Sequence, residues 1–283
     1  MANCGTIAMA KALNEYKIPV ALHKFYEADV LRSLTDEFFL RNFYTLGIRD
    51  EDYNKLKLTG LNPQLICIDV ANGYIKKFLD FVKKIRDEYP TSYILAGNVC
   101  TFEGSKAIID AGANCAKVGI GNGAHCSTYN LTGVGLPQMD TVMGCSNKPY
   151  VEYGEERLPI CSDGGVKEIG DINKYLVVGA ELVMVGTMFC GYEENEGDWT
   201  FIQNWPQGYK KGRLQVYGMS SRVAQSNHYN KNKRTPEGVD TWIDYKGPVA
   251  NLAKHIIDGI QSCGAYIGKR NVSEFNQGAI IAV

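Results

Sequence analysis

The sequence predicts an α/β protein whose parallel strands and helices form a single (β/α)8 TIM-type barrel. Short apolar segments alternate with segments of helical periodicity from residue 7 to residue 186. Glycines and polar residues follow most of the expected strands, and barrels carry their functional residues at the carboxyl ends of strands. A length of 283 residues is ordinary for one barrel, so we expect one domain over residues 1–283.

Seven strands are expected, one fewer than a complete barrel requires. They lie at residues 18–24, 42–48, 65–70, 93–99, 116–121, 158–162 and 182–186. Helices are expected at residues 7–14, 26–36, 50–58, 75–88 and 102–111. The helix at 75–88 carries an apolar stripe that includes Phe78 and Val82 and suits packing on a sheet. Beyond the last strand, a hairpin at 192–217 and a polar flap at 220–236 predict an excursion at about 192–236.

Composition excludes several classes of function. The formal net charge of −1 provides no basic excess for a nucleic-acid backbone, so no nucleic-acid partner is expected. Nine cysteines occur without a CxxC pair, and there are only four histidines, which argues against a zinc site. No apolar run approaches ~20 residues, so no membrane partner is expected. Together these features predict a soluble, cytoplasmic protein.

One loop, residues 117–138, is central to the interpretation of the chain and has the sequence KVGIGNGAHCSTYNLTGVGLPQ. Three glycines, at 119, 121 and 123, expose the backbone, and Cys126 and Thr128 follow them. Such a loop can hold an ion or a phosphate beside a thiol nucleophile. Taken alone, the cysteine also fits a small buried hydrophobic residue, and the glycine spacing is not that of a dinucleotide fingerprint.

Read as a whole, the pattern VGIGxGxxCxTxxxTGVGxPQ resembles the active-site loop of the family that contains inosine monophosphate (IMP) dehydrogenase and guanosine monophosphate (GMP) reductase. The resemblance implies that Cys126 attacks carbon 2 of a purine nucleotide. It also implies that Thr128 and Glu237 transfer a proton, and that a monovalent cation, potassium, binds at Gly121, Gly123 and Cys126. Without it, Glu237 would be read as an exposed loop acid.

Four other stretches resemble the same family, so that the likeness extends from Gly5 to about Gly268. The residues implied to bind the cofactor, NADPH, are Lys24, Asp69, Val70, Ala71, Ile120, Gly121, Arg234, Ser262 and Cys263. Those implied to bind the nucleotide are Asp163, Gly164, Gly165, Gly186, Thr187, Gly218, Met219, Ser220, Arg234 and Gly238. Individually these are ordinary turn and loop residues; a lone Asp-Gly-Gly is usually only a turn.

The sequence departs from the family pattern in three places. The family's first strand precedes a segment like residues 5–11, and this chain begins near that point. A truncated reading, a strand from a separate chain, or a rearranged and inactive relative would each account for the gap. In the loop, Ala124 replaces a phosphate-holding serine and Tyr129 a common arginine, for which His125 and Thr187 could compensate.

The resemblance favours reductive deamination of GMP to IMP, with NADPH as hydride donor, ammonia as product and a homotetramer as the assembly. The dehydrogenase branch carries an adjacent Arg-Tyr pair in its flap, and none occurs between Gly218 and Gly238. The alternatives are IMP dehydrogenase and a catalytically silent nucleotide-binding relative. Cys115 and Cys161 are expected to be buried packing residues.

Overall fold

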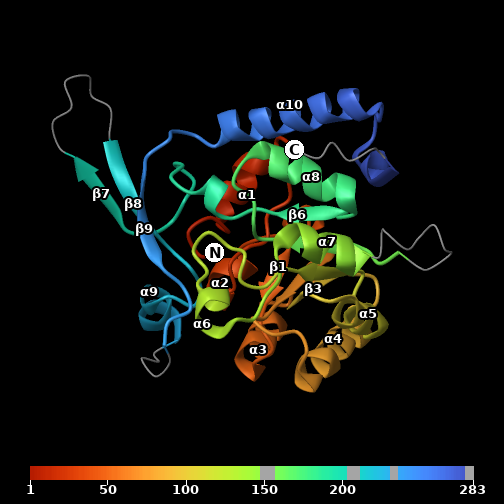
Figure 1. Ribbon diagram of the computed structural model, residues 1–283. Coiled ribbons are helices and arrows are strands. Elements are labelled where there is room, and N and C mark those ends of the chain that lie inside the picture. Colours follow the sequence, from red (N-terminus) through yellow and green to blue (C-terminus); the bar gives the residue numbers. More distant parts are fainter. Residues whose placement is uncertain (147–156, 203–210, 230–234, 278–283) are drawn as a thin grey trace.

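Six parallel strands lie side by side in the order in which they occur along the chain. The computed structural model describes residues 1–146, 157–202, 211–229 and 235–277. Within them the curled sheet consists of β1 (Tyr44–Leu46), β2 (Leu65–Asp69), β3 (Tyr93–Val99), β4 (Cys115–Val118), β5 (Ile160–Asp163) and β6 (Leu182–Met184). Helices follow the strands and cover the outside of the sheet (Figure 1). The fold is therefore of the expected α/β barrel class, with six strands in a curled, incomplete barrel.

The helices between consecutive strands follow the βα order. They are α3 (Asp50–Thr59), α4 (Lys76–Glu88), α5 (Phe102–Asp110), the short α6 (Thr128–Thr132), α7 (Gln138–Ser146) and α8 (Ile169–Val178). Helices α1 (Ile7–Asn14) and α2 (Ala28–Arg32) precede β1, and α10 (Ala250–Ile267) packs against α8 and α1. The predicted helix at 26–36 is thus much shorter, and α7, α8 and α10 had no sequence prediction. The predicted apolar stripe of α4 is buried through Phe78, Phe81, Val82 and Ile85.

Side chains alternate between the two faces of the sheet. On β3, Ile94 and Ala96 belong to the large core under the helices, whereas Leu95 belongs to a smaller inner core. The inner core takes one buried residue from each of five strands or strand ends: Phe43, Cys67, Leu95, Cys115 and Cys161. Cys115 and Cys161 are therefore packing residues, as expected, and burial raises the pKa of the Cys115 thiol to about 12.

The predicted strand at residues 18–24 is wrong in extent. Only Ala21 pairs in parallel with Phe43, through hydrogen bonds on either side of it. At the opposite edge, Leu182, Val183 and Met184 are each partly exposed, and among the described residues no strand besides β5 pairs with β6. Among the described residues, the sheet is therefore open between β6 and Ala21.

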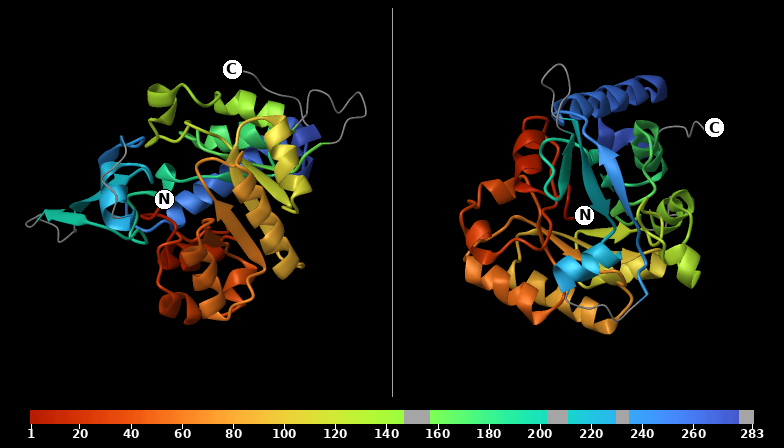
Figure 2. Two further views of the ribbon diagram at one scale, coloured as in Figure 1. Left: turned by 90° about the horizontal axis from the view of Figure 1, so that it is seen from below. Right: turned by 90° about the vertical axis from the view of Figure 1, so that its left-hand side faces the viewer.

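The N-terminal segment lies across this opening, and both figures place the N-terminus in the middle of the molecule (Figures 1 and 2). Gly5 accepts a hydrogen bond from the His23 amide, with 2.8 Å between nitrogen and oxygen. The Met1 sulfur lies 4.0 Å from the Thr187 hydroxyl, beyond the end of β6. The first five residues thus contact both sides of the opening at its carboxyl end.

A second, antiparallel sheet projects from the barrel (Figure 2). It consists of β7 (Trp199–Ile202), β8 (Lys211–Tyr217) and β9 (Asp240–Asp244). Strands β7 and β8 form the hairpin expected within 192–217, whereas β9 was not predicted. Between β8 and β9 the flap contains α9 (Arg222–Ala224) and a π-helical turn at Gln225–Tyr229.

Candidate active site

The loop after β4 places Cys126 at the carboxyl end of the sheet. Next to the strand, Gly119 and Gly121 adopt positive φ values of 137° and 86°. A Cβ atom on Gly119 would lie 2.1 Å from the backbone oxygen of Asp163, so only glycine fits there. The Cys126 amide donates to the Gly123 oxygen at 2.9 Å, which closes the turn. The thiol is thus held, partly exposed, next to the end of β5.

A hydrogen-bonded chain joins the three residues predicted to be catalytic. The Cys126 thiol lies 3.3 Å from Thr128 Oγ1, and that hydroxyl donates to Glu237 Oε2 at 2.8 Å. Glu237 is 109 positions from Thr128 in sequence, and an antiparallel bridge between Cys126 and Gly238 brings the two segments together. The arrangement can pass a proton between sulfur and carboxylate through one hydroxyl.

A buried lysine that the sequence analysis missed connects the predicted cofactor and nucleotide residues. Lys117 is 1% exposed, and its ammonium lies 2.7 Å from Asp69 Oδ1 and 2.6 Å from Asp163 Oδ2. It also donates to the side-chain oxygen of Asn98. The signal was present in the alternation of β4, because Lys117 follows the inward-facing Cys115 by two residues.

The same spacing applies to the neighbouring strands, where Asp69 follows Cys67 and Asp163 follows Cys161. A charged layer thus lies directly above the inner apolar core. Burial opposes the charge on Lys117, but Asp163 and Asp69 outweigh it and hold the lysine pKa well above its usual value. The surrounding protein opposes ionisation of Asp69 also, yet Lys117 and Lys24 lower its pKa overall.

The glycine turns at the ends of β5 and β6 border the central loop. The Gly165 amide donates to the Asn122 oxygen at 2.9 Å. Beyond β6, the Thr187 hydroxyl lies 3.2 Å from Nδ1 of His125, the residue next to Cys126. The structure therefore brings Asp163, Gly164, Gly165, Gly186 and Thr187 into the neighbourhood of the predicted nucleophile.

Residues on both sides of the flap meet at His125. A Cβ atom on Gly218 would lie 2.4 Å from the His125 oxygen, and one on Gly238 would lie 3.0 Å from it. The Gly218 amide donates to Val239 at 3.0 Å. Met219 is half-buried and Ser220 exposed, just before the flap helix α9. Gly218 and Gly238 thus belong to the site because their lack of a side chain allows this approach.

The predicted cofactor residues divide into two groups. Lys24 donates to the Asp69 backbone oxygen at 3.4 Å, and Val70 and Ala71 follow Asp69 at the end of β2. These lie on the same side of the barrel as Ile120 and Gly121. Ser262 and Cys263 lie instead on α10, the helix that packs against α8, so their role stays a prediction. Arg234 lies outside the described residues.

The flap is anchored by aromatic contacts that sequence patterns did not reveal. The Phe25 ring stacks on His228 with 3.9 Å between centroids and 15° between planes. Arg49 lies over the Tyr229 ring at 5.1 Å, and Tyr217 Oη lies 3.0 Å from His228 Nε2. Because Phe25 follows Lys24, this stack places the π-helical turn beside the predicted cofactor residues.

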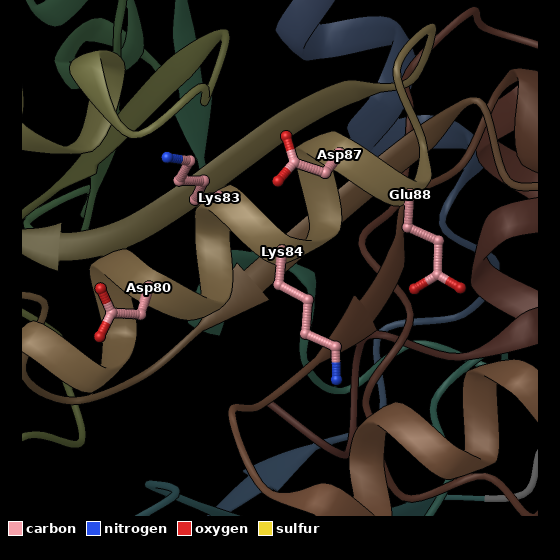
Figure 3. A pocket seen from close by; sticks show the side chains of 5 residues that line it. All are labelled: Asp80, Lys83, Lys84, Asp87 and Glu88. Atoms are coloured by element: carbon pink, nitrogen blue, oxygen red, sulfur yellow. The ribbon is translucent and has the colours of Figure 1, made fainter.

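The charged hollow on the outer face of α4 is a different feature. Figure 3 shows it lined by Asp80, Lys83, Lys84, Asp87 and Glu88, whose side chains are spread along the helix. The Lys84 ammonium lies 3.4 Å from the centroid of the Tyr53 ring, so it already makes a cation–π contact within the protein. None of these residues belongs to the charged layer or the cysteine loop.

Two classes of site are not found in the described part of the chain. Among those residues, no cluster of three or more histidine, cysteine, aspartate or glutamate side chains could hold a metal ion. Within the same segments, every helix is too short or too polar to cross a membrane.

Comparison with known proteins found a matching family model and matching relatives. The family model for the IMP dehydrogenase / GMP reductase domain matches residues 43–282. The chain is 38% identical over 284 residues to the GMP reductase of Caenorhabditis elegans, covering 97% of this chain and 76% of that protein. It is 36% identical over 286 residues to the GMP reductase of Klebsiella pneumoniae, covering 98% of this chain and 80% of the relative.

Among solved structures, a variant GMP reductase of Trypanosoma brucei in complex with guanosine 5′-monophosphate superimposes with a TM-score of 0.70. The two sequences are 28% identical, and the match covers 84% of this chain. The chain spans 48% of the length of that protein, just under half.

Proposed function

The chain belongs to the IMP dehydrogenase / GMP reductase family, and from that premise we propose that it reductively deaminates GMP to IMP with NADPH, releasing ammonia. The observation that carries the proposal is the chain of contacts from Cys126 through Thr128 to Glu237. It supplies a nucleophile and a proton carrier at the same place, as removal of an amino group from carbon 2 requires.

The nucleotide would be bound by the ends of β5 and β6. Asp163 presents one carboxylate oxygen to Lys117 and is 27% exposed, so it can accept hydrogen bonds from ribose hydroxyls. The backbone amides of Gly164, Gly165 and Gly186 and the Thr187 hydroxyl suit a 5′-phosphate. Gly218, Met219, Ser220 and Gly238 would border the purine.

The chemical step begins with transfer of the Cys126 proton through Thr128 to Glu237. The sulfur electron pair then forms a bond to carbon 2 of the purine, and the amino group takes up a proton and leaves as ammonia. Hydride addition to carbon 2 and cleavage of the carbon–sulfur bond release IMP and return the thiolate. Glu237 and Thr128 thus move the protons, and Cys126 holds the covalent intermediate.

NADPH supplies the hydride when bound, and the residues present suit it. At the end of β2, near Val70 and Ala71, the partly exposed Asp69 carboxylate provides a negative charge and the Lys24 ammonium a positive charge. A monovalent cation such as potassium would take backbone oxygens of Gly121, Gly123 and Cys126. That donor set suits a hard cation, because backbone carbonyl oxygens are hard ligands.

We further propose a cytoplasmic protein that assembles as a homotetramer. All nine cysteines are free thiols, which suits a reducing compartment. In such an assembly the exposed Ser262 and the partly buried Cys263 on α10 could serve a cofactor bound between subunits. Arg234 is proposed to contact both cofactor and nucleotide.

One experiment tests the activity directly. Purified protein is incubated with GMP and NADPH, and both the absorbance of NADPH and the released ammonia are followed. Equal molar loss of NADPH and gain of ammonia is expected, with little NAD reduction when IMP and NAD are supplied. Steady production of xanthosine monophosphate from IMP would instead show a dehydrogenase.

A further inference from the structure

His125 is a buried histidine between the cysteine loop and the second sheet. It is 6% exposed, and both ring nitrogens contact threonine hydroxyls. Nδ1 lies 3.2 Å from Thr187 Oγ1, and Nε2 lies 2.8 Å from Thr241 Oγ1. Thr187 follows β6 and Thr241 belongs to β9. The imidazole therefore links the nucleophile's loop to the proposed phosphate turn and to the second sheet.

The two contacts constrain the proton on the ring. Burial lowers the pKa of His125, although the nearby Asp240 opposes this, so the neutral form is favoured. A neutral imidazole has one N–H donor and one acceptor nitrogen. It must therefore donate to one threonine and accept from the other.

The choice between the two tautomers decides what Thr187 can offer a ligand. If Nδ1 accepts from Thr187, the hydroxyl hydrogen is used on the ring and the oxygen lone pairs face the site. If Nδ1–H donates to Thr187, the hydroxyl hydrogen is not used on the ring, and an anion would compete for it only with the weak acceptor Met1 Sδ, which lies 4.0 Å away. Ala124, the residue before His125, has no hydroxyl that could take this role.

We propose that His125 is a positioning residue for the 5′-phosphate of the nucleotide: its Nδ1–H donates to Thr187 Oγ1 and turns the hydroxyl hydrogen toward the phosphate. Thr241 completes the arrangement by donating to Nε2. The inference rests on the proposed function and deepens it, because it names the side chains that select a nucleotide over a nucleoside.

Two amide substitutions separate the roles of the two nitrogens. The side-chain nitrogen of asparagine can occupy the place of Nδ1, and that of glutamine the place of Nε2. His125→Asn is expected to keep GMP affinity within about threefold, whereas His125→Gln and Thr187→Val weaken it about 10- to 100-fold, as loss of a hydrogen bond to a charged group does. His255→Gln, at an exposed position on α10, is the matched control and should change nothing.

Binding of GMP, guanosine and ribose 5-phosphate is measured by calorimetry for each protein. The proposal expects His125→Gln to weaken GMP and ribose 5-phosphate but leave guanosine within about twofold, with KM for GMP raised and kcat little changed. Ala124→Ser should restore part of the lost phosphate affinity. Equal weakening of GMP and guanosine, or equal behaviour of the Asn and Gln variants, would show that His125 only supports the loop and would overturn the proposal.

A spectroscopic readout addresses the tautomer itself. With four histidines in the chain, the ¹⁵N resonances of His125 can be assigned by substitution. In the complex with ribose 5-phosphate, the proton should be on Nδ1 of His125. A proton on Nε2 in that complex would refute the inference. If ribose 5-phosphate binds as expected but GMP is not turned over, the proposed function fails and the inference stands. If GMP is turned over but the binding of ribose 5-phosphate does not depend on His125 as expected, the inference fails and the proposed function stands.

Discussion

At the scale of single residues, the nine cysteines differ in role because their surroundings differ. Cys126 is partly exposed and hydrogen-bonded to a hydroxyl, whereas Cys115 is fully buried among apolar side chains. Cys126→Ala is expected to abolish turnover and to leave GMP binding within about tenfold, since Asp163 and the glycine turns hold the ligand. Steady-state kinetics and calorimetry measure the two effects separately.

Cys115→Ala is the matched control for that substitution. It should retain turnover and lower the free energy of unfolding by about 1 kcal/mol, because it removes only packing. Wild-type turnover in Cys126→Ala would rule out the covalent mechanism. Loss of turnover in a folded Cys115→Ala would show that the two cysteines were sorted wrongly.

Lys117 provides a second prediction at this scale. Lys117→Met should lower the free energy of unfolding at pH 7 by about 2 kcal/mol. This is less than the roughly 3–5 kcal/mol lost when a fully buried ion pair is broken, because Asp69 and Asp163 are partly exposed to solvent. Without the lysine, two carboxylates face each other, so one folded-state pKa rises above its unfolded value. The folded variant then takes up a proton, and its deficit should shrink as pH falls from 7 to 5.

The wild type should keep the contribution of Asp69 between pH 7 and 5. The Asp69 pKa is lowered, so its contribution is present above the ordinary value of 3.8 and is lost as pH falls below it. Lys76→Met, which removes a surface pair with Asp80, is the control and should cost no more than about 0.5 kcal/mol at either pH. Denaturant titrations at pH 7 and 5 supply the numbers. A deficit for Lys117→Met that grows toward pH 5 would contradict the assignment of charges.

At the scale of elements, the flap depends on one aromatic stack. Phe25→Ala removes the ring that supports His228, and aromatic pairs of this kind contribute about 0.5–1.5 kcal/mol. Amide exchange across Arg222–Ala224 and Gln225–Tyr229 should therefore accelerate roughly up to tenfold, as read by mass spectrometry. Tyr266→Ala, at a side chain that is 85% exposed on α10, should leave it unchanged. Unchanged exchange in Phe25→Ala would show that other contacts hold the flap.

The elements also show where sequence reasoning succeeds. Local patterns predicted β2, β3 and α4, because alternation and helical periodicity are properties of short segments. Local patterns missed β9, and they predicted too long a strand at residues 18–24 and too long a helix at residues 26–36. The extent of these elements depends on partners that are distant in sequence. The same reason hid Lys117 and the Phe25–His228 stack. Cys126, Thr128 and Glu237 were proposed from the family resemblance, and the structure joins them by hydrogen bonds.

At the scale of the whole molecule, the opening between β6 and Ala21 leaves the edge strand less protected from amide hydrogen exchange than the centre of the sheet. Strand β3 is paired on both sides by β2 and β4, while β6 is paired by β5 alone among the described strands. Alternate amides of a parallel edge strand have no partner on the open side. A polypeptide of residues 1–283 should therefore exchange the amides of Leu182–Met184 at least about 100-fold faster than those of β3.

The same open edge should make this polypeptide prone to self-association, because unpaired backbone groups offer a template to another chain. Light scattering is expected to show association that increases with concentration, and unfolding should begin at the edge before the centre of the sheet. Native-state exchange resolved by residue, together with a thermal scan, tests both expectations. Equal protection of β6 and β3 in a monodisperse sample that unfolds cooperatively at high temperature would mean that the chain closes the opening with its own residues. The contacts of Gly5 with His23 and of Met1 with Thr187 identify the N-terminal segment as the first place to look for such closure.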